Sequence, residues 1–290
     1  MFDDVLIPTD GSTETEQAVS HGLGLARTYD ATVHALHVSD ESELPAVPEA
    51  HVREQLRSTA ETLGERATAD VVERAEEFDI PTERELRRGT PHEEIIDYVE
   101  DRSIDLVVMG THGQAGVAPD LGSTTLRVVR TADVPALTVR FREGVDVDVG
   151  SHYRVYDDIL VATDGSDGAL DAAEGGLDVA EMYGATVHAL YVVDPTTYAY
   201  EDVEGSLVGL LKESGNAALE EIEAMGQDRG VEVVKPVRRG RPATEILDYT
   251  DNNDIDLLTL GVHGWTGEVH LGSTTERVIR TAAQPTLSVR

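Results

Sequence analysis

Short runs of apolar residues alternate along this chain with longer stretches in which apolar residues recur at helical spacing. Val5-Leu6-Ile7 is bounded by Pro8 and by Asp10-Gly11, which is typical of a short strand buried on both faces. Similar patterns predict further strands at 32–38, 83–88, 105–109 and 135–140, and helices at 12–29, 49–78, from about 90, and at 123–131. Alternation of strands and helices predicts an α/β domain with a parallel sheet.

The whole pattern occurs twice in the same order. The segment ATVHAL at 31–36 recurs at 185–190, TDGS at 9–12 recurs at 163–166, and GSTT at 122–125 recurs at 272–275. A repeat of this length indicates a duplicated domain and not a short-period solenoid. We therefore expect two domains, 1–140 and 154–290, joined by a linker at 141–153.

Composition narrows the class of protein. The 290 residues suggest about two domains. The 56 acidic and 23 basic residues give a formal net charge of −33, which argues against a nucleic-acid partner. Lys212 and Lys235 are the only lysines, and cysteine is absent. These features are typical of a halophilic protein whose carboxylates hold hydrated cations, although an ordinary acidic protein remains the alternative.

Nothing in the sequence indicates a membrane partner. No apolar run approaches the roughly 18 residues of a membrane span, and the acidic start, Met1 to Asp4, does not have the pattern of a signal peptide. We expect a cytoplasmic protein.

Glycines and small polar residues follow the first and fourth predicted strands, where an open parallel sheet binds its ligands. In the first copy these are Thr9-Asp10-Gly11-Ser12, then Gly110, Gly113 and Gly122-Ser123. Glycines admit an anion to backbone amides, and a helix N-terminus favours negative charge. The pattern predicts a phosphate cradle without lysine, and it matches neither a Walker A loop nor a dinucleotide fingerprint.

Each of these residues also has a structural interpretation. Gly110 could serve close packing of a helix on a strand, Ser123 could be a helix N-cap, and Asp10 could form a turn before Gly11. The two interpretations are evenly balanced for any single residue. Their common order, and their presence in both copies, favours a binding site.

The motifs at 5–12, at 89–91 (Gly-Thr-Pro) and at Gly110-x2-Gly113…Gly122-Ser123, with their second-copy partners, resemble those of the universal stress protein family over essentially the whole chain. The resemblance implies two tandem Rossmann-like domains of the adenine-nucleotide α-hydrolase type. Each would have a five-stranded parallel sheet of order 3-2-1-4-5. It also implies dimer-like pairing through the last strand, either as an intramolecular pseudo-dimer of the two copies or within a homo-oligomer.

The resemblance further implies an ATP-binding regulatory protein of the stress response, with an adenine nucleotide as partner and ATP, with or without Mg²⁺, as cofactor. Asp10 and Asp164 would contact the adenosine, and Val38 and Val192 would line the base pocket. The phosphates would lie on Gly110, Gly113, Gly122, Ser123 and Thr124, and in the second copy on Gly261, Gly264, Gly272, Ser273 and Thr274. Strand-end residues complete the implied site: Pro8, Thr9, Met109, Ala162, Thr163 and Leu260.

The glycine loops depart from the family pattern, which has nine residues between the second and third glycines. The first copy has eight residues there, including Asp120, and the second has seven, including Glu268. A nucleotide-free interaction module acting as a pseudo-dimer is therefore the alternative function. No spacing suggests a catalytic triad or a positioned general base, so at most a weak ATPase is expected.

Two pairs of histidines could be mistaken for functional groups. His34 and His37 look like a metal pair, but residues three apart on a strand face opposite sides. His112 and His263 recur beside the glycine loops. They could reach a ligand, although the sequence favours ordinary surface-loop histidines.

Overall fold

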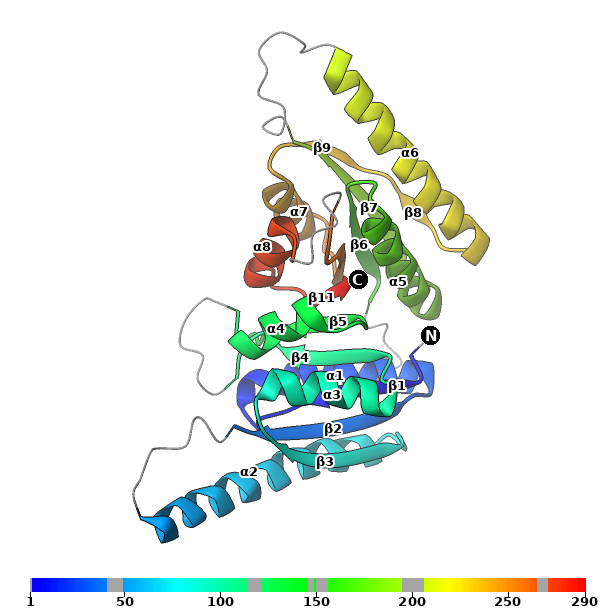
Figure 1. Cartoon of the computed structure of the whole chain (residues 1–290). Coiled ribbons are helices and arrows are strands. Elements are labelled where there is room, and N and C mark those ends of the chain that lie inside the picture. The colour runs from blue at the N-terminus through cyan, green and yellow to red at the C-terminus, as the bar shows by residue number, and fades with distance from the viewer. Residues whose placement is uncertain are drawn as a thin grey trace. The chain divides into compact units, whose positions relative to one another are not determined.

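The computed structural model describes residues 2–40, 49–113, 121–145, 149, 156–194, 206–264 and 271–290, with the backbone alone at 206–212. The chain divides into two compact units, Met1–His152 and Tyr153–Arg290. In each unit, helices cover both faces of a sheet (Figure 1). None of the described helices is both long enough and apolar enough to cross a bilayer.

The first unit is a five-stranded parallel sheet in the order β3-β2-β1-β4-β5. This confirms the predicted order 3-2-1-4-5. Its elements along the chain are β1 (Asp4–Pro8), α1 (Thr13–Tyr29), β2 (Thr32–Ser39), α2 (Ala50–Glu76), β3 (Thr82–Arg88), α3 (Pro91–Arg102), β4 (Leu106–Gly110), α4 (Ser123–Thr131) and β5 (Ala136–Val139).

The second unit repeats this topology, with the strand order β8/β9-β7-β6-β10-β11, all parallel. Its elements are β6 (Asp158–Thr163), α5 (Asp167–Tyr183), β7 (Thr186–Val193), α6 (Ser206–Arg229), β8 (Val233–Val234), β9 (Val237–Arg239), α7 (Pro242–Asn252), β10 (Leu257–Gly261), α8 (Ser273–Thr281) and β11 (Thr286–Val289).

One element of the second unit differs from the expectation that it repeats the first. Its third strand is split into β8 and β9 by Lys235-Pro236, where the first unit has the continuous strand β3. Proline has no N–H to donate to a neighbouring strand and fixes its own φ angle, so it interrupts regular pairing. The sequence pattern therefore predicted the place of the third strand correctly, but it did not predict the break in that strand.

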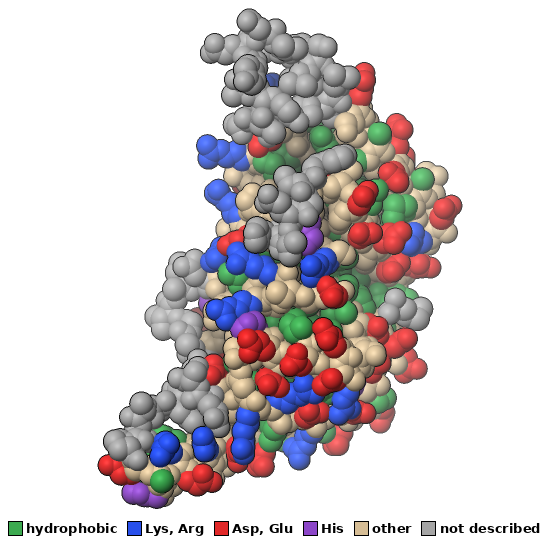
Figure 2. All heavy atoms as spheres, in the orientation of Figure 1, with side chains coloured by type: hydrophobic (Ala, Val, Ile, Leu, Met, Phe, Trp, Pro, Cys, Tyr) green, Lys and Arg blue, Asp and Glu red, His purple; other side chains and the backbone are tan. Residues whose placement is uncertain are grey.

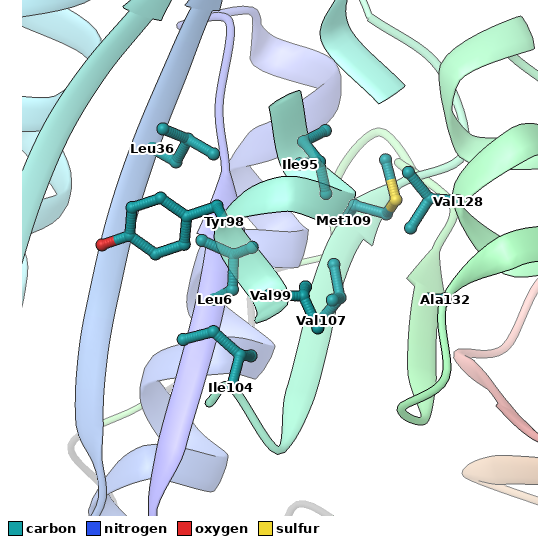
Figure 3. Packing of buried hydrophobic residues seen from close by; sticks show 10 residues of the cluster. All are labelled: Leu6, Leu36, Ile95, Tyr98, Val99, Ile104, Val107, Met109, Val128 and Ala132. Atoms are coloured by element: carbon teal, nitrogen blue, oxygen red, sulfur yellow. The ribbon is translucent and has the colours of Figure 1, made fainter. Parts of the chain in front are cut away.

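The central strand β1 is buried on both faces, as its apolar run predicts. Leu6 belongs to the same buried cluster as Leu36, Tyr98 and Val128, which lies under α3 and α4 (Figure 3). Ile7 faces the other way, toward α1, where a β-carbon on Gly22 would lie 2.6 Å from the Ile7 Cδ1. The alternation of β1 thus places α3 and α4 on one face of the sheet and α1 on the other.

The segment expected to be a linker begins on the surface of the first unit. The Gln17 side chain of α1 donates to the carbonyl oxygens of Arg142 and Val145 at 2.7 and 2.6 Å, and it accepts from the Arg142 N–H at 2.9 Å. Arg27 donates to the Val149 carbonyl at 2.7 Å. Residues 141–145 and 149 are therefore anchored along α1, while 146–148 and 150–155 lie outside the described residues.

Candidate functional site

The turn after β1 is held together by its own side chains. Asp10 Oδ1 accepts hydrogen bonds from the Ser12 N–H at 3.0 Å and from the Ser12 hydroxyl at 2.6 Å. Thr9 Oγ1 accepts from the Gly11 N–H at 3.1 Å, and Gly11 has a φ of +72°, a value that glycine adopts without strain. Asp164, Ser166 and Thr163 make the same bonds in the second unit.

Ser12 precedes α1 but does not cap it with its side chain. It occupies the N-cap position and its hydroxyl donates to Asp10, but its oxygen accepts no hydrogen bond from a helix N–H. In the second unit Ser166 does both, and its hydroxyl accepts from the Ala169 N–H at 3.4 Å. The turn-forming interpretation of Asp10 is therefore correct as far as its Oδ1 is concerned.

The other carboxylate oxygen of Asp10 reaches the loop after β4. A β-carbon on Gly113 would collide with Asp10 Oδ2, and one on Gly264 would lie 2.9 Å from Asp164 Oδ2. Residues 10 and 113 are far apart in the sequence, yet they meet at the carboxyl ends of β1 and β4. The structure thus brings together the two motifs from which the sequence predicted a site.

The fourth helix begins directly beside the end of β4. The Gly122 N–H donates to the Thr111 carbonyl at 2.8 Å, and the Thr125 hydroxyl donates to the Gly110 carbonyl at 2.8 Å. Thr275 and Gly261 repeat the second contact at 2.7 Å. These bonds fix the start of α4 against the strand end, so that its first N–H groups and the exposed Ser123 hydroxyl border the loop.

Two predictions about this helix need correction or extension. Gly122 is the N-cap and Ser123 is the first helical residue, so Ser123 is not a cap. Thr125 and Thr275 were not singled out from the sequence, although the repeated GSTT motif contained the signal. Their hydroxyls, each bonded to a glycine carbonyl, are what hold the helix start in place.

The residues expected to line a base pocket lie on one face of the sheet. Met109 is 5% exposed and belongs to the buried cluster that also contains Val128 of α4 (Figure 3). Val38 packs against this cluster. In the second unit Leu260 and Val278 belong to the matching cluster, with Ala162 and Val192 packed against it. The apolar strand-end residues and the start of the fourth helix are thus on the same side of each sheet.

The glycines differ in what the fold itself demands of them. A β-carbon on Gly110 would lie 3.0 Å from the His112 carbonyl oxygen and 3.2 Å from that of Glu14, and one on Gly261 would lie 2.6 Å from the Gly168 carbonyl oxygen. These two glycines allow a helix to pack closely on a strand end, as the structural interpretation held. At Gly272 the nearest atom would be 3.5 Å away, so the fold alone does not require glycine there.

His112 is fixed by a neighbour at one ring nitrogen. Its Nδ1 lies 3.0 Å from the Thr111 hydroxyl, and Thr111 is 3% exposed. Its Nε2 is buried and has no hydrogen-bond partner among the described residues. The loop after Gly113 lies outside the described residues at 114–120. The same is true of the corresponding loop of the second copy at 265–270. Asp120 and Glu268 belong to these two loops.

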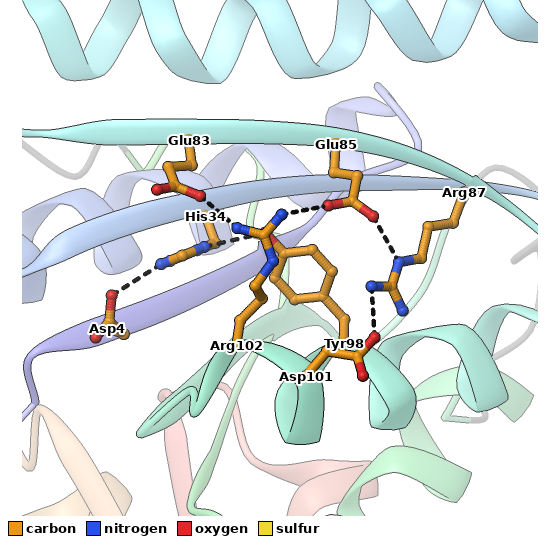
Figure 4. Close-up of polar contacts among 8 residues, drawn as sticks. All are labelled: Asp4, His34, Glu83, Glu85, Arg87, Tyr98, Asp101 and Arg102. Carbon is orange, nitrogen blue, oxygen red and sulfur yellow. Dashed lines mark hydrogen bonds and ion pairs between the residues drawn. The ribbon is translucent and has the colours of Figure 1, made fainter.

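His34 and His37 face opposite sides of β2, as predicted, and do not form a metal pair. His34 lies between Asp4 Oδ1 at 2.9 Å and the Tyr98 hydroxyl at 3.0 Å (Figure 4). His37 Nδ1 lies 2.8 Å from the Thr9 carbonyl oxygen. Within the described ranges, no cluster of three or more His, Asp or Glu side chains is arranged to hold a metal ion.

The His34 contacts form a second polar cluster, which the sequence did not reveal. Arg87 and Arg102 lie over the Tyr98 ring, 4.8 and 5.5 Å from its centroid, and burial raises the pKa of Tyr98 above its ordinary value. Arg102 donates to Glu83 and Glu85, and Arg87 to Glu85 and Asp101 (Figure 4). His188, Asp158 and Tyr249 repeat the histidine contacts in the second unit. The cluster joins β1, β2, β3 and α3.

Comparison with known proteins agrees with this architecture. The model of the universal stress protein family matches residues 1–140 and 156–290. A universal stress protein of Methanocaldococcus jannaschii is 38% identical over 141 residues, which are 47% of this chain and 83% of that protein. One from Bacillus subtilis is 28% identical over 149 residues, 48% of this chain and 100% of the relative.

The fold is also found in a solved structure of similar length. The crystal structure of a universal stress protein from Archaeoglobus fulgidus aligns with a TM-score of 0.73 and 24% identity, over 99% of this chain and 96% of that one. The family model covers nearly the whole chain in two successive matches. The chain therefore belongs to the universal stress protein family and consists of two family repeats in tandem.

Proposed function

We propose that this protein binds ATP at the carboxyl ends of β1 and β4 in the first repeat, and of β6 and β10 in the second, and acts as a ligand-dependent regulator. The observation that carries the proposal is the meeting of Asp10 with Gly113, and of Asp164 with Gly264. This contact joins the predicted adenosine-binding turn to the predicted phosphate loop in both repeats.

The residues present fit the shape and charge of a nucleotide. The N-terminus of α4 offers unpaired N–H groups and the positive end of a helix dipole to phosphates, next to the exposed Ser123 hydroxyl. Val38, which is partly exposed, would provide an apolar surface for a base. Two further features fit a phosphate site. The fold leaves space beside Gly272, and the Nε2 atom of His112 has no hydrogen-bond partner among the described residues.

Mg²⁺ would accompany the nucleotide through its phosphates. Because the described residues form no metal-binding cluster of their own, the ion would enter with ATP and not before it. It would neutralise part of the triphosphate charge in a chain whose formal net charge is −33. The chain's own contribution is to bind and orient the nucleotide, and we assign no catalytic residue.

The test begins with protein purified in high KCl. Its bound small molecules are released by denaturation and adenine nucleotides are counted per chain by chromatography. About two per chain supports binding in both repeats, and about one supports binding in a single repeat. No nucleotide, together with no rise in melting temperature on adding Mg-ATP, contradicts the proposal and favours the nucleotide-free interaction module.

Gly272→Ala gives a clean test of the site itself. The φ and ψ of Gly272, −58° and 139°, are open to alanine, and the new methyl group would meet no atom closer than 3.5 Å. The variant should therefore fold, with a small loss of stability because alanine is a poorer N-cap than glycine, yet lose ATP binding in the second repeat. Unchanged ATP stoichiometry in this variant would place the phosphates elsewhere.

We further propose that the two repeats act as a pseudo-dimer within one chain. Size-exclusion chromatography with light scattering separates a monomeric chain from a homo-oligomer. We further propose that the protein works in the cytoplasm of a halophile, because acidic side chains are spread among basic ones on the surface seen in Figure 2, and Lys212 and Lys235 are the only lysines of the chain. Stability that depends on molar KCl would support this.

A further inference from the structure

The Nε2 atom of His112 is a buried polar atom without a partner. Its ring is not loosely placed, since Nδ1 lies 3.0 Å from the Thr111 hydroxyl, which is itself buried. The described part of the structure provides no donor or acceptor for Nε2. Roughly nine in ten buried polar atoms in folded proteins have a partner, so this exception calls for an explanation.

The position of His112 points to the explanation. A β-carbon on Gly110 would lie 3.0 Å from the His112 carbonyl oxygen, and one on Gly122 would lie 3.8 Å from the His112 Cα. The histidine therefore lies between the end of β4 and the N-cap of α4, where the phosphates are proposed to bind. Residues 110–124 contain neither lysine nor arginine. His112 is the one side chain in this stretch that can carry positive charge.

We propose that His112 donates a hydrogen bond from Nε2 to a phosphate oxygen of the nucleotide in the first repeat, and takes the role that a lysine plays in other phosphate loops. This inference rests on the proposed function. When Nδ1 accepts from the Thr111 hydroxyl, the proton of the neutral ring is on Nε2, which is then a donor. Protonation of the ring keeps Nε2 a donor and adds charge, which strengthens the bond to an anion.

The second repeat does not orient its histidine in this way. Val262 stands where the first repeat has Thr111, so His263 has no preceding hydroxyl to fix its ring. The two nucleotide sites should therefore respond differently to pH. Thr111→Val converts the first repeat to the arrangement of the second, with little change in side-chain volume.

Charged residues occur on the elements around this loop. They are Asp10 in the turn after β1, Glu14 in the first turn of α1, Arg127 on α4 and Arg140 after β5. The phosphates add negative charge when the nucleotide binds, so binding and protonation of His112 favour each other.

The experiment compares ATP, ADP and adenosine by calorimetry at pH 6 and pH 8, in the full chain carrying Gly272→Ala so that the first repeat is observed. His112→Ala should weaken ATP binding by about tenfold at pH 6, the usual cost of losing a hydrogen bond to a charged group, and leave adenosine unchanged. His112→Gln keeps a neutral donor near the position of Nε2. It should retain most of the affinity at pH 8 but lose the gain that the parent protein shows at pH 6.

Two controls sharpen the comparison. His51→Gln alters an exposed histidine at the start of α2 and should change neither affinity nor its pH dependence. Thr111→Val should reduce the pH 6 gain without removing it. Because ATP itself titrates in this range, the result is the difference between parent and variant at each pH, from which the ligand's own titration cancels.

Nuclear magnetic resonance of ¹⁵N-histidine-labelled protein gives a readout that does not depend on affinity. The His112 signal, assigned by its loss in His112→Gln, should move on adding ATP and stay in place with adenosine. An unmoved signal with ATP bound, or equal pH dependence in parent and His112→Gln, overturns this inference and leaves the proposed function standing. An absence of ATP binding to the unmodified chain overturns the proposed function instead.

Discussion

The imidazole of His37, near the end of β2, fills the space that a β-carbon on Gly64 of α2 would need. The second repeat has the same relationship, because a β-carbon on Gly215 would lie 2.5 Å from the Tyr191 ring. His37 Nδ1 also donates to the Thr9 carbonyl at 2.8 Å, directly before Asp10. A glycine in the long helix thus lets a ring from the sheet support the turn that carries the site.

The effect of Gly64→Ala on the free energy of unfolding should change sign when the His37 ring is removed. In the native background it should lower the free energy of unfolding by roughly 1–3 kcal/mol, because the added methyl overpacks the His37 ring. In a His37→Ala background the same change should raise it by up to about 1 kcal/mol, since alanine is the better helix former and the space is open. Urea unfolding of the four proteins measures the coupling. Equal effects in both backgrounds would contradict the contact.

His21 on α1 should make the protein less stable in mild acid. Its side chain is buried, and desolvation lowers its pKa from 6.5 to about 4. The unfolded chain therefore binds this proton at a higher pH than the folded one, so the contribution is complete above pH 6.5 and is lost as pH falls toward 4. Between pH 6.5 and 5 the loss is about 2 kcal/mol.

The His21 contribution is isolated by subtraction. His21→Gln cannot take up this proton, so its unfolding free energy should fall by about 2 kcal/mol less than that of the native protein over the same interval, at constant KCl. Acidic residues affect both proteins alike. Parallel pH profiles for the two would show that His21 is not buried as a neutral ring.

Sequence periodicity and the internal repeat predicted most of the fold because they depend on neighbours along the chain. The apolar run at 5–7 forms a strand buried on both faces as predicted, and α3 begins at Pro91, close to the predicted start at about residue 90. The split of β8 from β9 was also encoded, in Pro236, but reading the second copy as a replica of the first concealed it.

The site was predictable in its location and less so in its contacts. That strand ends carry the ligand follows from topology, and so Asp10 and Gly113 could be placed on the same edge. The Ser12 hydroxyl donates to Asp10 without accepting from a helix N–H, whereas the Ser166 hydroxyl does both, and spacing does not reveal this difference. The Asp4–His34–Tyr98 cluster joins residues from three elements, and only the folded register brings them together.

Tyr98→Phe should destabilise the first repeat through His34. The His34 Nε2–H donates to Asp4, so Nδ1 accepts from the Tyr98 hydroxyl, and its loss leaves a buried acceptor unpaired. The expected cost is about 1–3 kcal/mol in unfolding free energy, with the cation–π contacts of Arg87 and Arg102 retained because the ring remains. Tyr249→Phe is the matched change in the second repeat. An unaltered unfolding curve for both would deny the hydrogen bonds any role in stability.

The melting temperature should rise with KCl concentration from dilute buffer to molar salt. The chain's formal charge of −33 repels itself at low ionic strength, and cations screen that repulsion. Differential scanning calorimetry in KCl at constant pH measures the effect, and the same series in sucrose separates charge screening from general exclusion effects. A melting temperature that stays constant or falls would identify an ordinary acidic protein.

The outer strand of the sheet differs between the two repeats, being β3 in the first and the interrupted pair β8 and β9 in the second. The difference affects how each sheet edge resists aggregation. A strand at the end of a sheet exposes N–H and C=O groups that can pair with another molecule. The first repeat places the charges of Glu83, Arg84 and Arg88 on β3, whereas the second interrupts its outer strand with Pro236, beside the exposed Val234 and Val237. One edge resists intermolecular pairing by charge, which salt weakens, and the other by the break in its outer strand at Pro236, which salt does not affect.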